Sequence, residues 1–210
     1  MQDLRKALAD IDAIKGQVAR ATVFRGYGPA TIALTGIVAI AAAVIQALWL
    51  DNPRHQTAGF LTIWIGVALI SAVLIGGETV TRSRRLHSNL ADEMIYAAIE
   101  QLIPVAVTGG LLTFVLVRFA PDAAWMLPGL WQILFSLGIF ASCRLLPKSL
   151  FAAGAWYLTT GLVCIAAGPE GNSWTPNPWS PWSMGLPFGV GQLLKAGILY
   201  YALGGSDGEE

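Results

Sequence analysis

Six long stretches without a single charged residue set the strongest limit on how this chain folds. They cover residues 26–50, 55–77, 101–117, 123–143, 149–169 and 171–194. A helix needs about 20 mainly apolar residues to cross the hydrocarbon core of a membrane. Only 12% of the residues are charged, against roughly 25% in a soluble domain. The apolar runs are continuous rather than alternating, which argues against the strands of a membrane barrel.

The predicted fold is therefore an all-α polytopic membrane protein, with residues 27–204 forming one transmembrane domain. We expect six transmembrane helices arranged as three antiparallel hairpins, with spans near 29–50, 58–77, 99–120, 123–143, 149–168 and 183–204. Leu-Pro followed by glutamine occurs in both the fourth and the sixth span, which suggests a repeated hairpin. The second span lacks this pattern, so chance similarity is the alternative explanation.

Residues 1–26 are predicted to form an amphipathic cytoplasmic helix. Charged residues occur throughout 1–25, which is not the pattern of a cleavable signal. The apolar residues recur every three or four positions and share one helix face: Leu4, Ala7, Leu8, Ile11, Ile14 and Val18. A second helical stripe within 82–100 leads into the third span. Residues 1–25 and 82–100 would serve as docking surfaces for a protein partner or a second copy, and 205–210 would form a flexible acidic tail.

The distribution of lysine and arginine predicts the orientation in the membrane. Ten of these residues lie before the first span or in the loops after the second and fourth spans, whereas the opposite loops hold only Arg54 and Arg118. The positive-inside rule places the richer side in the cytoplasm. We therefore expect a multi-pass protein of the cell (inner) membrane with both termini cytoplasmic. The outer segment 174–182 contains three tryptophans and three prolines, which predicts an aromatic belt or, alternatively, an external lid or an aromatic ligand site.

A few polar residues fall near the middle of the predicted spans. Lys195 is the one full charge deep inside an apolar span, and such residues are often functional. The candidate ligand-binding residues are Lys195, Gln192, Gln132, Thr159 and Thr160. The candidate ion-pair partners of Lys195 are Glu100 and Glu78, both near the inner ends of their spans. The alternative is that the amides and hydroxyls bond neighbouring helices while the lysine snorkels inward.

No motif for catalysis or for a cofactor accompanies these residues. His55 and His87 fall on opposite sides of the predicted membrane, and Cys143 and Cys164 differ too much in depth to form a disulfide. The sequence has no zinc-type cysteine spacing, no phosphate-binding glycine loop and no Ser-His-Asp set on one side. We therefore expect no metal, no cofactor and no nucleic-acid partner, and the sequence disfavours an enzyme.

Three functional classes remain. The favoured one is a membrane protein that binds or passes a small molecule or ion through a polar site at mid-membrane. The alternative is a membrane-anchored sensor, regulator or assembly subunit that acts through its cytoplasmic helices. A membrane enzyme is the third class. A retinal protein would also need a lysine in its last span, but six spans and no deep acid argue against it.

Overall fold

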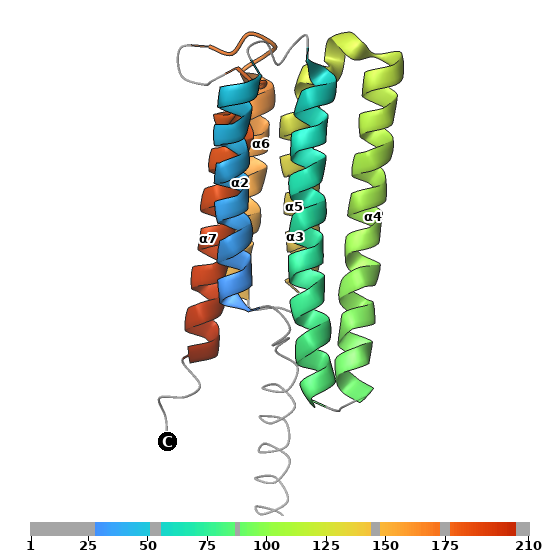
Figure 1. Cartoon of the computed structure of the whole chain (residues 1–210), viewed down its shortest axis with the longest axis vertical. Helices are drawn as coiled ribbons and strands as arrows, with labels where there is room; N and C mark the ends of the chain where they lie inside the picture. The colour runs from blue at the N-terminus through green and yellow to red at the C-terminus, as the bar shows by residue number, and fades with distance from the viewer. Residues whose placement is uncertain (1–27, 51–55, 87–88, 144–147, 173–176, 205–210) are drawn as a thin grey trace, which may run out of the picture.

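The computed structural model describes residues 28–50, 56–86, 89–143, 148–172 and 177–204, with the backbone alone at 82–86, 89–102 and 202–204. These parts of the chain are almost entirely helical (Figure 1). The elements are α2 (Pro29–Trp49), α3 (Thr57–Leu86), α4 (Asn89–Phe119), η1 (Pro121–Met126), α5 (Leu127–Ser142), η2 (Lys148–Leu150), α6 (Phe151–Ala166) and α7 (Trp182–Gly204). The all-α prediction is confirmed for this part of the chain.

Four of the helical segments are long and apolar enough to cross a membrane: Pro29–Trp49, Thr57–Thr81, Pro121–Ser142 and Lys148–Ala166. In α4 the apolar part is shorter, Ile103–Phe119. Helix α7 has 23 residues, but its glycines, proline, glutamine and lysine leave it less apolar than those four. Each predicted span coincides with a helical segment, four of them being candidates to cross a membrane. A count of six membrane spans stays a prediction.

Local signals at the helix ends explain where the spans begin and stop. Helix α2 begins with Gly28 as its N-cap and proline in its first turn, a position where the missing N–H of proline costs nothing. Helix α6 ends at Ala166, and two residues later Gly168 has a φ of 73°, in the left-handed region. Glycine adopts that conformation readily and so terminates helices. Both signals come directly from the sequence.

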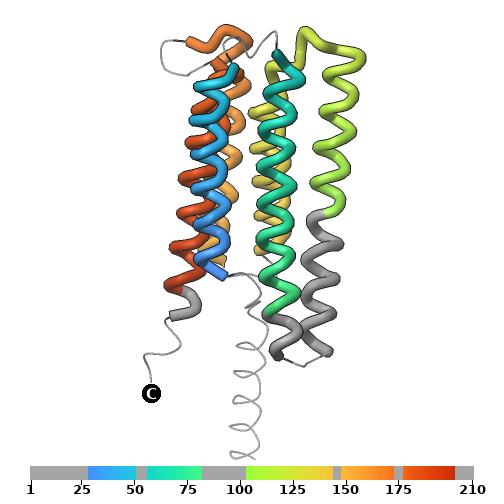
Figure 2. Tube along the Cα trace, viewed as in Figure 1, coloured from blue at the N-terminus to red at the C-terminus, as the bar shows by residue number. Residues whose placement is uncertain are grey.

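The six α-helices lie roughly parallel, and consecutive ones run in opposite directions (Figure 1). In the view of Figure 2, α2, α6 and α7 lie on the left and α3, α4 and α5 on the right. Contacts between α5 and α6 and between α2 and α3 connect the two halves of the view. The most extensive packing is α2 with α7 and α5 with α6. The predicted hairpin partners, α2 with α3, α4 with α5 and α6 with α7, also pack against each other, but less extensively. The arrangement as three hairpins stays a prediction.

Glycine explains why those two pairs approach so closely. A Cβ atom on Gly129 of α5 would lie 2.7 Å from the carbonyl oxygen of Gly161 in α6. A Cβ atom on Gly36 of α2 would lie 3.0 Å from the carbonyl oxygen of Gly189 in α7. In a membrane, small residues let helix backbones pack in direct contact and gain van der Waals energy. The missing Cβ atoms of these glycines therefore permit the close approach of α2 to α7 and of α5 to α6.

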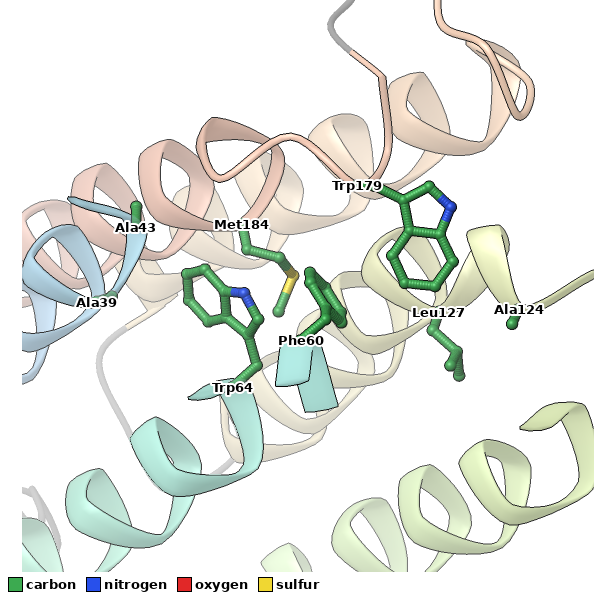
Figure 3. Close-up of a cluster of buried hydrophobic side chains, with 8 residues drawn as sticks. All are labelled: Ala39, Ala43, Phe60, Trp64, Ala124, Leu127, Trp179 and Met184. Atoms are coloured by element: carbon green, nitrogen blue, oxygen red, sulfur yellow. The ribbon is translucent and has the colours of Figure 1, made fainter. Parts of the chain in front are cut away.

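The largest apolar cluster fills one end of the bundle, the end that the orientation rule predicts to be outside. Figure 3 shows it, with side chains from α2, α3, η1, α5, α7 and the segment before α7: Ala39, Ala43, Phe60, Trp64, Ala124, Leu127, Trp179 and Met184. The Phe60 and Trp179 rings meet edge to face with centroids 5.1 Å apart, a favourable aromatic geometry. Trp179 is thus a core residue rather than part of a belt at the membrane surface.

Several predicted features lie outside the described residues. They are the amphipathic helix at 1–26, the acidic tail at 205–210 and Trp174. For the predicted docking surface at 82–100, the structure gives the helical backbone but no side chains. Docking through 1–25 or 82–100 therefore stays a prediction.

Candidate functional site

Lys195 lies on α7 and faces the interior of the bundle. Its Nζ atom sits 5.1 Å from the centroid of the Phe135 ring on α5, within the distance of a cation–π contact. The side chain is half-buried, whereas the preceding Leu193 and Leu194 are exposed on the outer surface of the helix. None of the ion pairs or hydrogen bonds among the described residues involves Lys195. The ammonium group therefore has an aromatic face as its contact and no carboxylate.

Three aromatic rings build the wall behind this amine. Phe135 of α5 lies 4.8 Å from Tyr157 of α6, and Phe188 of α7 lies 5.5 Å from Phe135 and 5.2 Å from Tyr157. Tyr157 is fully buried, and its hydroxyl donates a long hydrogen bond of 3.5 Å to the carbonyl oxygen of Phe188. Helices α5, α6 and α7 therefore meet around Lys195 through packed rings.

Gln192 lies one turn from Lys195 on the same helix, on the outer side by the predicted orientation. It is 5% exposed, and its Oε1 atom is buried with no hydrogen-bond donor among the described residues. Its Cβ atom packs against Gly36 of α2. A buried carbonyl oxygen without a donor costs about 1–3 kcal/mol. This oxygen is a place where a donor from a bound molecule would recover that cost.

Gln132 has a structural task that its sequence context did not reveal. Its Nε2 atom donates a hydrogen bond of 2.9 Å to the carbonyl oxygen of Ser183, in the first turn of α7. In a regular helix the donor to Ser183 would be the N–H of residue 187, but Pro187 has none. Gln132 therefore replaces the donor that the proline removes. Its Oε1 atom, like that of Gln192, is buried without a donor in the described structure.

The two predicted threonines do not line the same space. Thr159 is exposed on the surface of α6. The Thr160 hydroxyl lies 3.0 Å from the carbonyl oxygen of Trp156 and donates within its own helix, a common arrangement for threonine in helices. Lys195 and Gln192 lie one turn apart on α7, Lys195 against Phe135 of α5 and Gln192 against Gly36 of α2. Neither threonine has a described contact with them.

The predicted acidic partners lie elsewhere or outside the described side chains. Glu78 of α3 lies at the N-terminus of α2, where its Oε2 atom accepts a hydrogen bond of 3.2 Å from the Gly28 N–H. A carboxylate is favourable there because the helix dipole places partial positive charge at the N-terminus. The side chain of Glu100 is not described. Glu78 therefore has an interaction that explains its position without Lys195.

A second buried polar centre, around Gln46, was missed by sequence reasoning. Gln46 is fully buried in α2; its Nε2 atom donates to the Trp179 carbonyl oxygen at 2.9 Å, and its Oε1 atom accepts from Trp64 Nε1 at 2.7 Å. Both polar ends of the side chain are satisfied, so this centre fastens α2 to α3 and to the segment before α7. A lone glutamine among the alanines of the first span was the available signal.

The described residues contain no group of three or more His, Cys, Asp or Glu side chains that could hold a metal ion. Cys143 and Cys164 are free. Comparison with protein-family models, with curated proteins and with solved structures finds no match to this chain.

Proposed function

We propose that this chain is a six-span membrane protein whose mid-membrane site on α7, formed by Lys195 and Gln192, binds or passes a small molecule or ion. The observation that carries the proposal is that, among the described residues, an inward-facing amine has no carboxylate partner and a buried amide oxygen one turn away has no donor. Two polar groups left unsatisfied one helical turn apart suit a ligand that supplies both missing partners.

The membrane setting is supported by the surface of the bundle. Many large apolar side chains are exposed on the outward faces of the helices, including Leu48 at 74%, Val73 at 72% and Phe119 at 70%. Soluble monomers rarely expose apolar patches of more than a few hundred Å². Lipid tails are the natural surroundings of such a surface. A shell of lipid also explains why the few buried polar residues are concentrated between helices.

The chemistry of the two groups defines the ligand class. An ammonium group donates hydrogen bonds and attracts negative charge, whereas an amide oxygen accepts hydrogen bonds. The site therefore suits a small anion that also carries an N–H or O–H group. Phe135, Tyr157 and Phe188 would form the apolar wall behind this ligand and strengthen its attraction to Lys195 by excluding water.

Cysteine accessibility tests the site directly. In a variant in which Cys143 and Cys164 are alanine, Lys195→Cys is compared with Leu193→Cys, which is 46% exposed on the outer surface of the same helix. The probe is a sulfonated, membrane-impermeant methanethiosulfonate, which reacts with the thiolate form. A ligand site needs a water-filled path, so we expect position 195 to react at least tenfold faster than position 193, where lipid suppresses ionisation.

Two results would contradict the proposal. Slow reaction at both positions would mean that no aqueous path reaches Lys195, which would leave it as a snorkelling residue. Fast reaction at position 193 would mean that this face of α7 lies in water, and the membrane assignment of α7 would fall.

The proposed orientation has a separate test. With both termini in the cytoplasm, the segment between α6 and α7 lies outside. A reporter enzyme that is active only outside the cytoplasm should work when inserted beside Asn172 and fail when fused after Glu210. The opposite pattern of activity would reverse the topology.

A further inference from the structure

A groove between α3 and α4 has a different character from the site at Lys195. The groove is open along one side and has a volume of about 380 Å³. Its lining is almost entirely apolar and comes from both helices: Leu61, Gly110, Thr113, Phe114, Val117 and Arg118. The groove lies toward the end of the bundle where α4 finishes, which is the predicted outer side.

The polar atoms of the groove floor are already satisfied. The Thr113 hydroxyl donates to the Gly109 carbonyl oxygen at 2.7 Å and accepts from Trp131 Nε1 at 3.0 Å. The groove is open at Gly110, where an added Cβ atom would meet nothing within 4 Å. A molecule in the groove would therefore meet an apolar channel with no free hydrogen-bonding group along its length.

Arg118 closes the outer end of this channel. Its guanidinium lies 5.6 Å from the centroid of the Phe119 ring, and no ion pair among the described residues involves it. Arg118 follows Gly110 by eight residues, which places it about 12 Å farther along the helix. Arg118 is one of only two cations, with Arg54, that the sequence places on the predicted outer side. Its planar fork of donors matches the oxygens of a phosphate group.

We propose that this groove binds one phospholipid with a negatively charged headgroup, with an acyl chain along the apolar channel and the phosphate on Arg118. An apolar channel that ends in an unpaired arginine at the predicted membrane surface complements the two parts of such a lipid. The inference uses the membrane embedding proposed above but not the Lys195 site, so either can fail alone.

Lipid retention by the full-length protein tests this. Protein in detergent micelles is titrated with phosphatidylglycerol or with phosphatidylcholine of the same acyl chains, and bound lipid is counted by native mass spectrometry. We expect the unchanged protein to retain at least threefold more phosphatidylglycerol than phosphatidylcholine. Arg118→Gln should remove that preference, and Gly110→Leu should reduce the binding of both lipids at least threefold by filling the channel.

Matched variants control for charge and for volume. Lys148→Gln removes a cation beside α6, and Gly197→Leu adds the same side chain at another open glycine. Both should bind lipid like the unchanged protein. Equal retention of the two lipids by the unchanged protein, or full retention by Gly110→Leu, would overturn the proposal. A change in oligomeric state caused by Gly110→Leu would also overturn it, because the groove would then be an interface between two copies.

Discussion

The contact between Gly161 and Gly129 makes a quantitative prediction about how α5 and α6 pack. A Cβ atom on Gly161 would lie 2.8 Å from the Gly129 carbonyl oxygen and 2.9 Å from Cγ1 of Ile133. A side chain can rotate away from such a contact, but a backbone oxygen moves only if its helix moves. We therefore expect Gly161→Ala to push the two helices apart.

The magnitude follows from comparison with a glycine that has free space. An added Cβ atom on Gly66 of α3 would meet nothing within 4 Å. Both changes gain the same helix propensity of about 1 kcal/mol, and this gain cancels in the difference between the two variants. Overpacking adds about 1–3 kcal/mol at Gly161 alone. Gly161→Ala should thus be less stable than Gly66→Ala by about 1–3 kcal/mol, whereas Gly66→Ala should match or exceed the unchanged protein.

Reversible unfolding in mixed micelles measures this difference. The mole fraction of a denaturing detergent is raised, and tryptophan fluorescence reports unfolding, since the chain has 8 tryptophans. Equal free energies of unfolding for Gly161→Ala and Gly66→Ala would refute the reasoning, because the closeness of α5 and α6 would then not depend on the missing Cβ atom.

Three further outcomes are expected in the same unfolding assay. Gln46→Leu should destabilise by about 1 kcal/mol, since it removes two hydrogen bonds worth on average about 0.6 kcal/mol each in membrane proteins; no loss would mean that neither bond stabilises the fold. Gln132→Leu should cost less in a Pro187→Ala background, where the restored N–H bonds the Ser183 carbonyl oxygen, and strict additivity of the two changes would disprove the proposed replacement. Lys195→Met should leave the free energy of unfolding equal or higher in this assay. In a separate functional measurement it should reduce ligand binding or cellular activity, and unchanged binding or activity would remove Lys195 from the proposed site.

The helices could be located from the sequence because lipid imposes a simple length rule. The predicted start at residue 29 and the observed start of α2 at Pro29 coincide, since glycine and proline mark that boundary in the sequence itself. The choice of helix partners was harder. Glycines such as Gly36 and Gly129 are visible in the sequence, but which helix each faces depends on rotation about the helix axis, which no local signal fixes.

The sequence alone gives part of the geometry of the candidate site, whose role stays a prediction. Lys195 and Gln192 share a helix, so their spacing alone places them on one face. Thr159 and Thr160 are neighbours in sequence, so they necessarily point in different directions, and the structure leaves Thr159 exposed. The contact between Lys195 and Phe135 joins α7 to α5, so it could be found only from the tertiary structure.

The two glutamines that share a sequence pattern show why the site is placed on α7. Each follows a Leu-Pro pair, yet only the amide nitrogen of Gln132 has a visible task, which is to bond the carbonyl oxygen left free by Pro187. Gln192 has no equivalent proline carbonyl to serve, and its buried Oε1 atom meets no donor in the described structure. If packing against Gly36 were its only role, leucine would fill the same space without burying an amide. Gln192 lies one turn from the amine of Lys195, and we propose that a ligand needing both groups is the reason for the buried amide.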